Sequence, residues 1–292
     1  MNGAKSSKQY QILCIDDEPS NLMLRKLVLQ SAGFSVLAAC SGKEGIDLFS
    51  SNPVDALVID FSMPDMDGGM VAVRIKELKP RIPVIMLSAY PGAQEGLDDA
   101  VDLFIEKGGD PKKLIRRIEA LVKIRDHSHP ELNSDYVVFV EPSRQIVDCS
   151  NVAGRLVGYT RMELLNKTLD QISYEPEDVP GLFEQYQQRK ALEGEHILKH
   201  KSGRPIAVRF RSWVFPDGCM AAICDPVTDW KELYRCAMLE LDPAKLKNRV
   251  EVALLAIHRR MRQLEQTPAK MTSEAVALND ALNGLRVLQK GA

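Results

Sequence analysis

Short apolar runs alternate with helical patterns over the first part of the chain, from Gln11 to Arg125. The runs have the length of buried strands, and the periods between them are typical of amphipathic helices. This alternation predicts a doubly wound α/β domain with a five-stranded parallel sheet and about five helices. The predicted strands are Ile12 to Ile15, Val36 to Ala39, Ala56 to Ile59, Val84 to Leu87 and Leu103 to Ile105.

Helix signals mark three of the connections between these strands. One helix is predicted after Pro19 and another over Gly42 to Phe49. A last one is predicted from Pro111 to Ile124, because Asp110 is a good N-cap and proline is favoured at the first helical position.

The pattern changes after residue 126. The stretch H-S-H-P-E-L-N-S, residues 127–134, has no apolar period and is typical of a linker. Two strands, several short helices and three longer strand-like runs follow, with turn signals at Ser202-Gly203 and Asp217-Gly218. This order predicts an α+β domain with an antiparallel sheet. We therefore expect four parts, residues 1–126, 127–134, 135–230 and 231–292.

Residues 231–292 carry helical patterns without strand signals. Two sets of apolar residues recur at steps of three and four, which places each set on one face of a helix. A helical hairpin that packs on itself or on a partner is the simplest interpretation. The two stripes are Val250, Leu254, Ile257, Met261 and Leu264, and Leu278, Leu282, Leu285 and Leu288.

Composition narrows the class of protein. The 292-residue chain is 45% hydrophobic and 27% charged, as globular proteins are, and its net charge of -2 gives no general attraction to nucleic acid or membranes. Its six cysteines show neither a C-x-x-C pair nor metal-ligand spacing. The N-terminus is polar and no apolar run approaches the length of a membrane span, so a cytoplasmic location is expected.

Polar and charged residues stand where the predicted strands end. Asp16 and Asp17 follow the first strand, Asp60 the third, Ser88 the fourth and Lys107 the fifth. The carboxyl ends of parallel strands form one edge of the sheet, where such domains bind ligands. Carboxylates crowded there repel one another unless a cation lies between them, and Mg²⁺ suits carboxylate, water and phosphoryl oxygens. Any one of these aspartates could be an ordinary surface residue, but a coincidence of all five positions is not expected.

The motifs around these residues resemble the response-regulator receiver family. They are I-L-C-I-D-D-E-P, V-I-D-F-S-M-P-D-M-D-G, M-L-S-A-Y and F-I-E-K, and the resemblance covers Gln11 to about Arg125. It implies a flavodoxin-like fold with Asp60 as the phosphoacceptor. It also implies that Lys107 and Ser88 contact the phosphoryl group, and that Ser88 reorients toward it.

The resemblance further implies a metal site and a switch residue. Mg²⁺ would be bound by Asp17, Asp60 and the backbone carbonyl of Ser62, with Asp16 acting mostly through metal-bound water. Phe104, three residues before the lysine, is similar to the switch aromatic of the family. The chemistry also has an independent basis, because a carboxylate nucleophile needs cations on both sides of an incoming phosphoryl group.

Two departures from the family pattern lie near the lysine. The family usually has proline after it, whereas this chain has Lys107-Gly108-Gly109, and the segment from Ser88 to Lys107 is about one helical turn shorter than usual. Glycine does not restrain the backbone as proline does, so a more mobile loop is expected. The phosphoryl chemistry should survive, whereas the dimer face of DNA-binding relatives is in doubt.

Residues from about Tyr136 to Trp230 resemble a PAS domain. The resemblance lies in Y-V-V-F-V, Q-I-V-D-C-S-N, the helical V-A-G-R-L-V-G-Y-T-R-M-E-L-L, the K-S-G-R-P-I hairpin and the closing D-P-V-T-D-W. It implies five antiparallel strands flanked by short helices. No residue set matches a haem or flavin attachment, so we expect no cofactor in this core. His196 and His200, with lysines beside them, are interpreted as residues of a solvated hairpin strand.

These features favour a response regulator of a two-component phosphorelay that accepts a phosphoryl group on Asp60 with Mg²⁺. It would be no enzyme beyond self-phosphorylation from small phosphodonors and slow autodephosphorylation. The expected partners are a sensor histidine kinase or phosphotransfer protein, and a second copy or another protein bound through the PAS domain and tail. Neither nucleic acid nor a membrane is expected as a partner.

Two alternatives stay open at this point. One is a PAS-based ligand sensor with a regulatory receiver, and the other is a transcription regulator that binds DNA through the first long helix of the tail. Basic helices can bind the DNA backbone, although glutamates intermix in this one. Its basic residues are Lys245, Lys247, Arg249, Arg259, Arg260 and Arg262.

Overall fold

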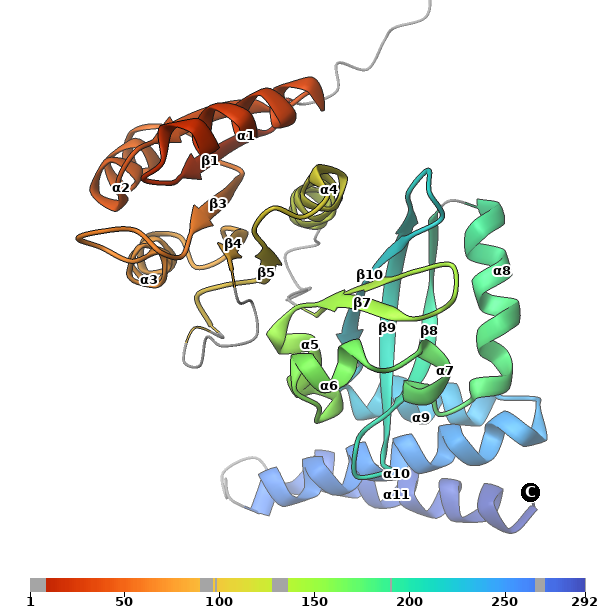
Figure 1. Ribbon diagram of the computed structural model, residues 1–292. Coiled ribbons are helices and arrows are strands. Elements are labelled where there is room, and N and C mark those ends of the chain that lie inside the picture. The colour runs from red at the N-terminus through yellow and green to blue at the C-terminus, as the bar shows by residue number, and fades with distance from the viewer. Residues whose placement is uncertain are drawn as a thin grey trace, which may run out of the picture.

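The computed structural model describes residues 9–89, 97, 99–127, 136–189, 191–265 and 271–291. They form two five-stranded sheets and a layer of C-terminal helices (Figure 1). The predicted linker lies outside the described residues except for His127. The domain boundaries expected from the sequence therefore stay predictions.

The first sheet is parallel, with its five strands in the order β2-β1-β3-β4-β5. The predicted doubly wound, flavodoxin-like fold is confirmed, and each strand agrees with its prediction to within one residue at either end. The inner strands β3 and β4 are buried along their whole length, because helices cover both faces of the sheet. The strands are β1 (Gln11–Ile15), β2 (Ser35–Ala39), β3 (Ala56–Asp60), β4 (Val84–Ser88) and β5 (Leu103–Glu106).

Four helices accompany this sheet in the part of the chain that the structure describes. Asp67 and Asp110 accept hydrogen bonds from backbone N–H groups at the starts of α3 and α4, as N-caps do. The expected fifth helix is not found among the described residues, and residues 90–96 and 98 of the β4–β5 connection lie outside them. The helices are α1 (Pro19–Ser31), α2 (Gly42–Ser51), α3 (Gly68–Leu78) and α4 (Pro111–His127).

The second sheet is antiparallel, as predicted, in the order β7-β6-β10-β9-β8. Short helices connect its second and third strands in the chain and cover one face, where Tyr186 packs edge-on against Phe183 and Phe210. The strands are β6 (Val137–Val140), β7 (Ile146–Cys149), β8 (Ala191–Lys199), β9 (Pro205–Val214) and β10 (Met220–Pro226). The helices are α5 (Asn151–Val157), α6 (Arg161–Leu165), α7 (Leu169–Ile172), the 3-10 turn η1 (Pro176–Asp178) and α8 (Val179–Arg189).

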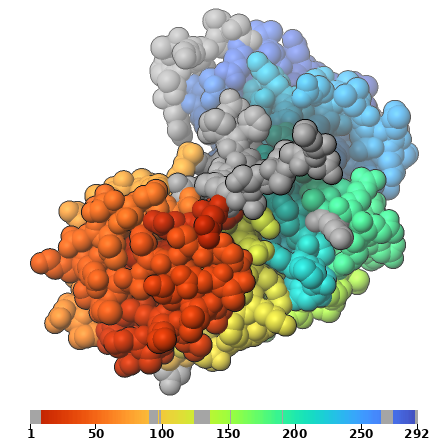
Figure 2. Space-filling model, turned by 90° about the horizontal axis from the view of Figure 1, so that it is seen from above, coloured from red at the N-terminus to blue at the C-terminus, as the bar shows by residue number. Residues whose placement is uncertain are grey.

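The opposite face of the second sheet is divided between two neighbours. Helix α4 covers one part of it, where Ile118 and Leu121 join an apolar cluster with Phe139 and Ala221 of β6 and β10. Figure 2 shows the yellow segment that includes α4 between the red and the green to cyan parts of the molecule. The same cluster continues into the first sheet at Ile12. The two domains therefore share a core.

The C-terminal helices cover the rest of that face. Helices α10 and α11 form the predicted hairpin, and Val250, Ile257 and Leu285 from the two stripes are buried against each other and against Ile197 and Ala207 of the sheet. The stripes therefore fill an internal core of this chain. None of the helices that the structure describes is long and apolar enough to cross a membrane. The helices are α9 (Trp230–Leu239), α10 (Pro243–Glu265) and α11 (Met271–Gly291).

Candidate functional site

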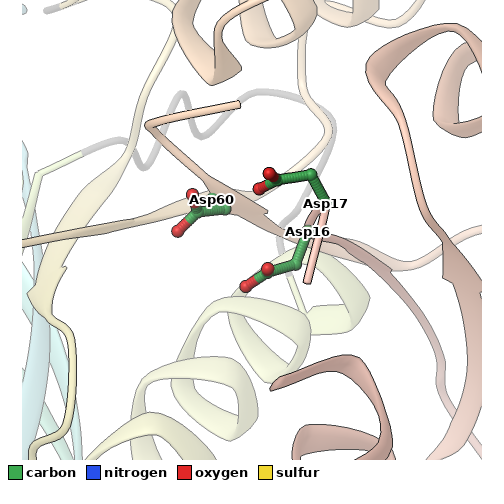
Figure 3. Close-up of side chains that lie close together, drawn as sticks. All are labelled: Asp16, Asp17 and Asp60. Carbon is green, nitrogen blue, oxygen red and sulfur yellow. The ribbon is translucent and has the colours of Figure 1, made fainter. Parts of the chain in front are cut away.

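Three aspartates meet at the carboxyl edge of the parallel sheet. Asp16 and Asp17 follow β1, and Asp60 ends the neighbouring strand β3. One carboxylate oxygen from each lies within 4.8 Å of the other two, and Figure 3 shows the three side chains directed to the same side. Asp16 and Asp60 are buried, whereas Asp17 is exposed. The parallel pairing of β1 with β3 brings these side chains together, as the strand-end pattern predicted.

The Asp60 carboxylate is enclosed beside a cation from the chain. Its Oδ1 pairs with the Lys107 ammonium, and no described residue donates a hydrogen bond to its Oδ2. Burial raises the pKa of Asp60, the hydrogen bond from Lys107 lowers it, and the charge of Asp16 raises it again. A buried carboxylate oxygen to which no described residue donates lies here next to two further carboxylates, and a hard divalent cation would neutralise their negative charge. The residues present therefore fit Mg²⁺.

A further residue of the site, Arg25 in α1, was missed by the sequence reasoning. Its Nη2 lies 3.0 Å from Oδ2 of Asp16, whose Oδ1 accepts the backbone N–H of Glu18 at 2.9 Å. A guanidinium at this distance competes electrostatically with a metal ion for Asp16. The only sequence signal is that Asn21 and Arg25 lie four apart on one face of α1, and this spacing does not show that the face meets Asp16.

The other predicted site residues lie around the aspartates. Ser88 is buried at the end of β4, and its carbonyl accepts the N–H of Lys107 at 2.9 Å. Phe104 is buried in β5, three residues before the lysine. Ser62 is exposed and follows shortly after β3. The roles of these residues in phosphoryl and metal binding stay predictions.

Two glycines shape the loops at this edge. A Cβ on Gly68 would lie 2.1 Å from the carbonyl oxygen of Asp60, so only glycine fits where α3 starts against β3. Gly108 has a φ of +78°, which proline cannot adopt because its ring holds φ near roughly -65°. Glycine in place of the usual proline after Lys107 therefore matches the left-handed backbone that this loop adopts. The greater mobility expected there stays a prediction.

The second domain encloses a small apolar cavity of about 50 Å³, lined by Tyr186 and His196 among other residues. Nε2 of His196 lies 2.8 Å from the Ser173 hydroxyl, and burial lowers the pKa of this imidazole to about 4. The interpretation of His196 as a solvated strand residue is wrong, because strand alternation turns it toward the core. His200 lies in the hairpin turn beyond the strand, where it pairs with Ser202.

Comparison with known protein families identifies two domains, in the order in which the two sheets follow one another along the chain. Residues 12–119 match the response regulator receiver domain, and residues 134–218 match the PAS domain. The chain therefore contains a receiver domain and a PAS domain, followed by C-terminal helices. The acidic site is the strand-end site of that receiver.

Three similar proteins each match less than half of this chain. The probable transcriptional regulator ycf27 of Cyanidium caldarium is 30% identical over 122 residues, 41% of this chain and 49% of the relative. The transcriptional regulatory protein GlrR of Escherichia coli is 35% identical over 117 residues, 39% of this chain and 26% of the relative. A solved receiver domain from Clostridium thermocellum, 27% identical with a TM-score of 0.38, covers 40% of this chain and 97% of that structure.

These relatives bear on the expected partners. A receiver domain implies a histidine kinase or another phosphodonor as partner. The chain spans about half or less of the length of the two curated relatives. Both are named as transcriptional regulators, so they give no support to the expectation that nucleic acid is not a partner.

Proposed function

We propose that this protein is a phosphoacceptor of a two-component phosphorelay and takes a phosphoryl group on Asp60 with the help of Mg²⁺. The observation that carries the proposal is the buried Asp60 carboxylate, which has the Lys107 ammonium on one oxygen and two further carboxylates beside it. Phosphoryl transfer depends mainly on positioning and charge neutralisation. At this edge of the sheet the Lys107 ammonium is one cation, and the carboxylates would hold Mg²⁺ as the second.

Asp60 acts as the nucleophile. One of its carboxylate oxygens attacks the phosphorus, the bond from phosphorus to the donor breaks, and the bonding electron pair leaves with the donor, so that an acyl phosphate remains on Asp60. Lys107 is held nearby through its N–H bond to the Ser88 carbonyl, and its ammonium can move from the carboxylate to a phosphoryl oxygen. The Ser88 hydroxyl, at the end of the neighbouring strand, would donate to another phosphoryl oxygen.

Mg²⁺ would be held by Asp17, Asp60 and the backbone carbonyl of Ser62, with Asp16 acting through water. When bound, the ion neutralises charge on the phosphoryl oxygens. The proximity of the three carboxylates supports this assignment, and so does the Asp60 Oδ2, to which no described residue donates a hydrogen bond. The chemistry proposed for this chain is limited to accepting the phosphoryl group and hydrolysing it slowly, with a kinase, a phosphotransfer protein or a small phosphodonor as the source.

The output that we propose is a contact with a second copy or another protein through the PAS domain and tail. Exposed apolar side chains on α10 and α11, namely Leu255, Val276 and Val287, offer area for such a contact. Several basic residues of α10 are already paired within the chain, and a paired cation must leave its carboxylate before it can bind a phosphate. The pairs are Lys245 with Asp178, Arg249 with Glu195 and Arg260 with Glu274.

A transcription regulator is the second candidate, because the curated relatives carry that name. Its output would be binding to DNA that weakens steeply as salt increases. Titration of the phosphorylated and unphosphorylated full chain with duplex DNA at several salt concentrations distinguishes the two outputs. Salt-dependent, sequence-selective binding would favour the transcription regulator.

Incubation of the full chain with acetyl phosphate and Mg²⁺ tests the phosphoacceptor function. We expect one phosphoryl adduct by intact-mass spectrometry, located in the peptide that contains Asp60 and lost on treatment with base. Removal of Mg²⁺ with EDTA should slow its formation by about 100-fold or more, because a bound metal contributes several kcal/mol to charge stabilisation. A folded protein that stays unlabelled with Mg²⁺ present would contradict the proposal.

Arg25→Gln protein is expected to bind Mg²⁺ about tenfold more tightly than wild type. The substitution removes a positive charge 3.0 Å from Asp16. Two unit charges roughly 7 Å apart repel by about 0.6 kcal/mol in water, so the guanidinium and the doubly charged ion repel by about 1.2 kcal/mol, close to a factor of ten in affinity. Isothermal calorimetry measures the affinity, and Arg25→Lys, which keeps the charge, is the control. Equal affinity of all three proteins would show that Arg25 does not compete with the metal.

The purified full chain is expected to carry no haem or flavin in its PAS domain. Its cavity holds about 50 Å³, whereas pockets for small molecules hold about 300 to 1,000 Å³. An absorption spectrum of freshly purified protein tests this directly. A stoichiometric haem or flavin band would contradict the expectation and make the PAS-based sensor the leading function.

A further inference from the structure

A buried ion cluster joins the receiver to the PAS domain. Asp148 of β7 has no exposed surface, and each of its carboxylate oxygens meets a different guanidinium. Nε of Arg117, from receiver helix α4, lies 2.8 Å from Oδ2. Nη2 of Arg161, the first residue of PAS helix α6, lies 2.7 Å from Oδ1. The arginine side chains are 2% and 12% exposed, so the cluster lies almost wholly inside the molecule.

Arg161 also contacts the receiver sheet itself. The Nη2 that pairs with Asp148 donates to the backbone carbonyl of Phe104 at 3.1 Å. Strand β5 is the edge of the parallel sheet, and an edge strand leaves a row of backbone groups without a neighbouring strand. Arg161 supplies one of the hydrogen bonds that a further strand would supply. A PAS side chain is thereby tied to the backbone of β5.

Strand β5 leads directly to the phosphoryl site. Lys107, three residues after Phe104, pairs with Asp60 and is hydrogen-bonded through its N–H to the Ser88 carbonyl. Three residues of extended chain span about 10 Å. The contact to Arg161 therefore lies in the middle of β5, and the ammonium that pairs with Asp60 belongs to the first residue after this strand. A phosphoryl group on Asp60 would draw that ammonium toward itself and strain the strand at the Arg161 contact.

The packing around this ion cluster favours a change between distinct arrangements over a gradual shift. The Arg117 guanidinium lies 3.7 Å from the centre of the Phe139 ring, whose face attracts cations. A capping box of Thr160 and Glu163 fixes the backbone where α6 starts. Packed interiors change between distinct states because they cannot deform continuously. A shift of β5 therefore lengthens one of the two contacts of Arg161, to Phe104 or to Asp148.

We propose that Arg161 is a positioning residue, which restrains β5 in its unphosphorylated arrangement and couples phosphorylation of Asp60 to the PAS domain. The inference rests on the proposed function, since the phosphoryl group on Asp60 is its input. Coupling between two sites is reciprocal. The junction therefore also sets how tightly the receiver binds a phosphoryl group, and removal of its restraint should strengthen that binding.

A second ion pair between the two domains provides a matched control. Arg155 of α5 pairs with Asp99, which precedes β5, at 2.8 Å. Their side chains are 49% and 93% exposed, and exposed pairs contribute little to stability. Arg155→Gln therefore removes the same charge and a pair between the same two domains, but leaves the buried cluster in place.

Beryllofluoride with Mg²⁺, used as a mimic of the phosphoryl group on the full chain, tests the coupling. Arg161→Gln should bind it about fivefold or more tightly than wild type by calorimetry, whereas Arg155→Gln should bind it with wild-type affinity. Hydrogen exchange adds a second readout. In wild type the mimic should change exchange in residues 103–107 and 146–165, and in Arg161→Gln only the receiver segment should respond.

Arg161→Lys keeps the inference testable if Arg161→Gln does not fold. An ammonium retains the charge but lacks the planar fork with which a guanidinium holds two acceptors, so the same tighter binding is expected. Unchanged affinity in a folded variant overturns the inference, and so does an equal increase in Arg155→Gln. If wild type itself does not bind the mimic, the phosphoacceptor function fails. Binding that is insensitive to Arg161 overturns the coupling alone.

Discussion

Asp60→Asn protein is expected to form no measurable phosphoryl adduct with acetyl phosphate and Mg²⁺, a loss of roughly 1,000-fold or more in labelling rate. An amide oxygen is a poor nucleophile, and it carries no charge with which to hold Mg²⁺ or pair with Lys107. Intact-mass spectrometry over a time course measures the loss. The fold should persist, because asparagine has the same shape and the cluster loses one of three mutually repelling carboxylates.

Asp47→Asn is the matched control for this experiment. Asp47 is an exposed residue of α2, so its replacement should leave labelling at the wild-type rate. A normal adduct on Asp60→Asn protein, mapped to Asp16 or Asp17, would overturn the assignment of Asp60. In that event the acceptor would still belong to the same acidic cluster, and the metal ligands would have to be reassigned.

Asp148→Ala is expected to lower the free energy of unfolding by about 3 to 5 kcal/mol. The carboxylate is fully buried and pairs with both Arg117 and Arg161. Its removal leaves two guanidiniums inside the junction without a counter-ion, and such uncompensated charges are costly to bury. Urea unfolding followed by circular dichroism measures the loss.

Asp99→Ala is the control for this experiment, because it shows how much stability is lost when an exposed ion pair between the two domains is removed. Asp99 pairs with Arg155 at an exposed position, and such pairs contribute about 0.2 to 1 kcal/mol. We therefore expect a small change for Asp99→Ala and a large one for Asp148→Ala. Equally small losses in the two proteins would show that the cluster around Asp148 does not stabilise the junction.

The strands and most of the acidic site could be predicted because their signals are local. An apolar run followed directly by Asp16 and Asp17, or by Asp60, identifies both a buried strand and the residue at its end. Parallel pairing then places all strand ends on one edge without further information. The start of α4 at Pro111 was predictable for the same reason, since an N-cap acts on the next few residues only.

Other features depended on conformations that a pattern does not specify. The sequence did not show that residue 108 needs a left-handed backbone, because glycine is compatible with many conformations. His196 was misplaced because the lysines around it indicated solvent, whereas the alternation of the strand and the hydroxyl of Ser173 turn it into the core. Arg25 shares a helix face with Asn21, but its contact with Asp16 depends on how α1 packs against the sheet.

The sequence by itself determined the two sheets, their order along the chain and the acidic edge of the first, because these follow from short-range periodicity and from residues adjacent to it. Only the tertiary structure decided how the domains meet. Arg117 and Asp148 are 31 residues apart, and Arg161 and Phe104 are 57 apart, so neither pair has a local signal. Periodicity shows that a face is apolar, but the partner that covers it is selected by shape and charge across the whole chain.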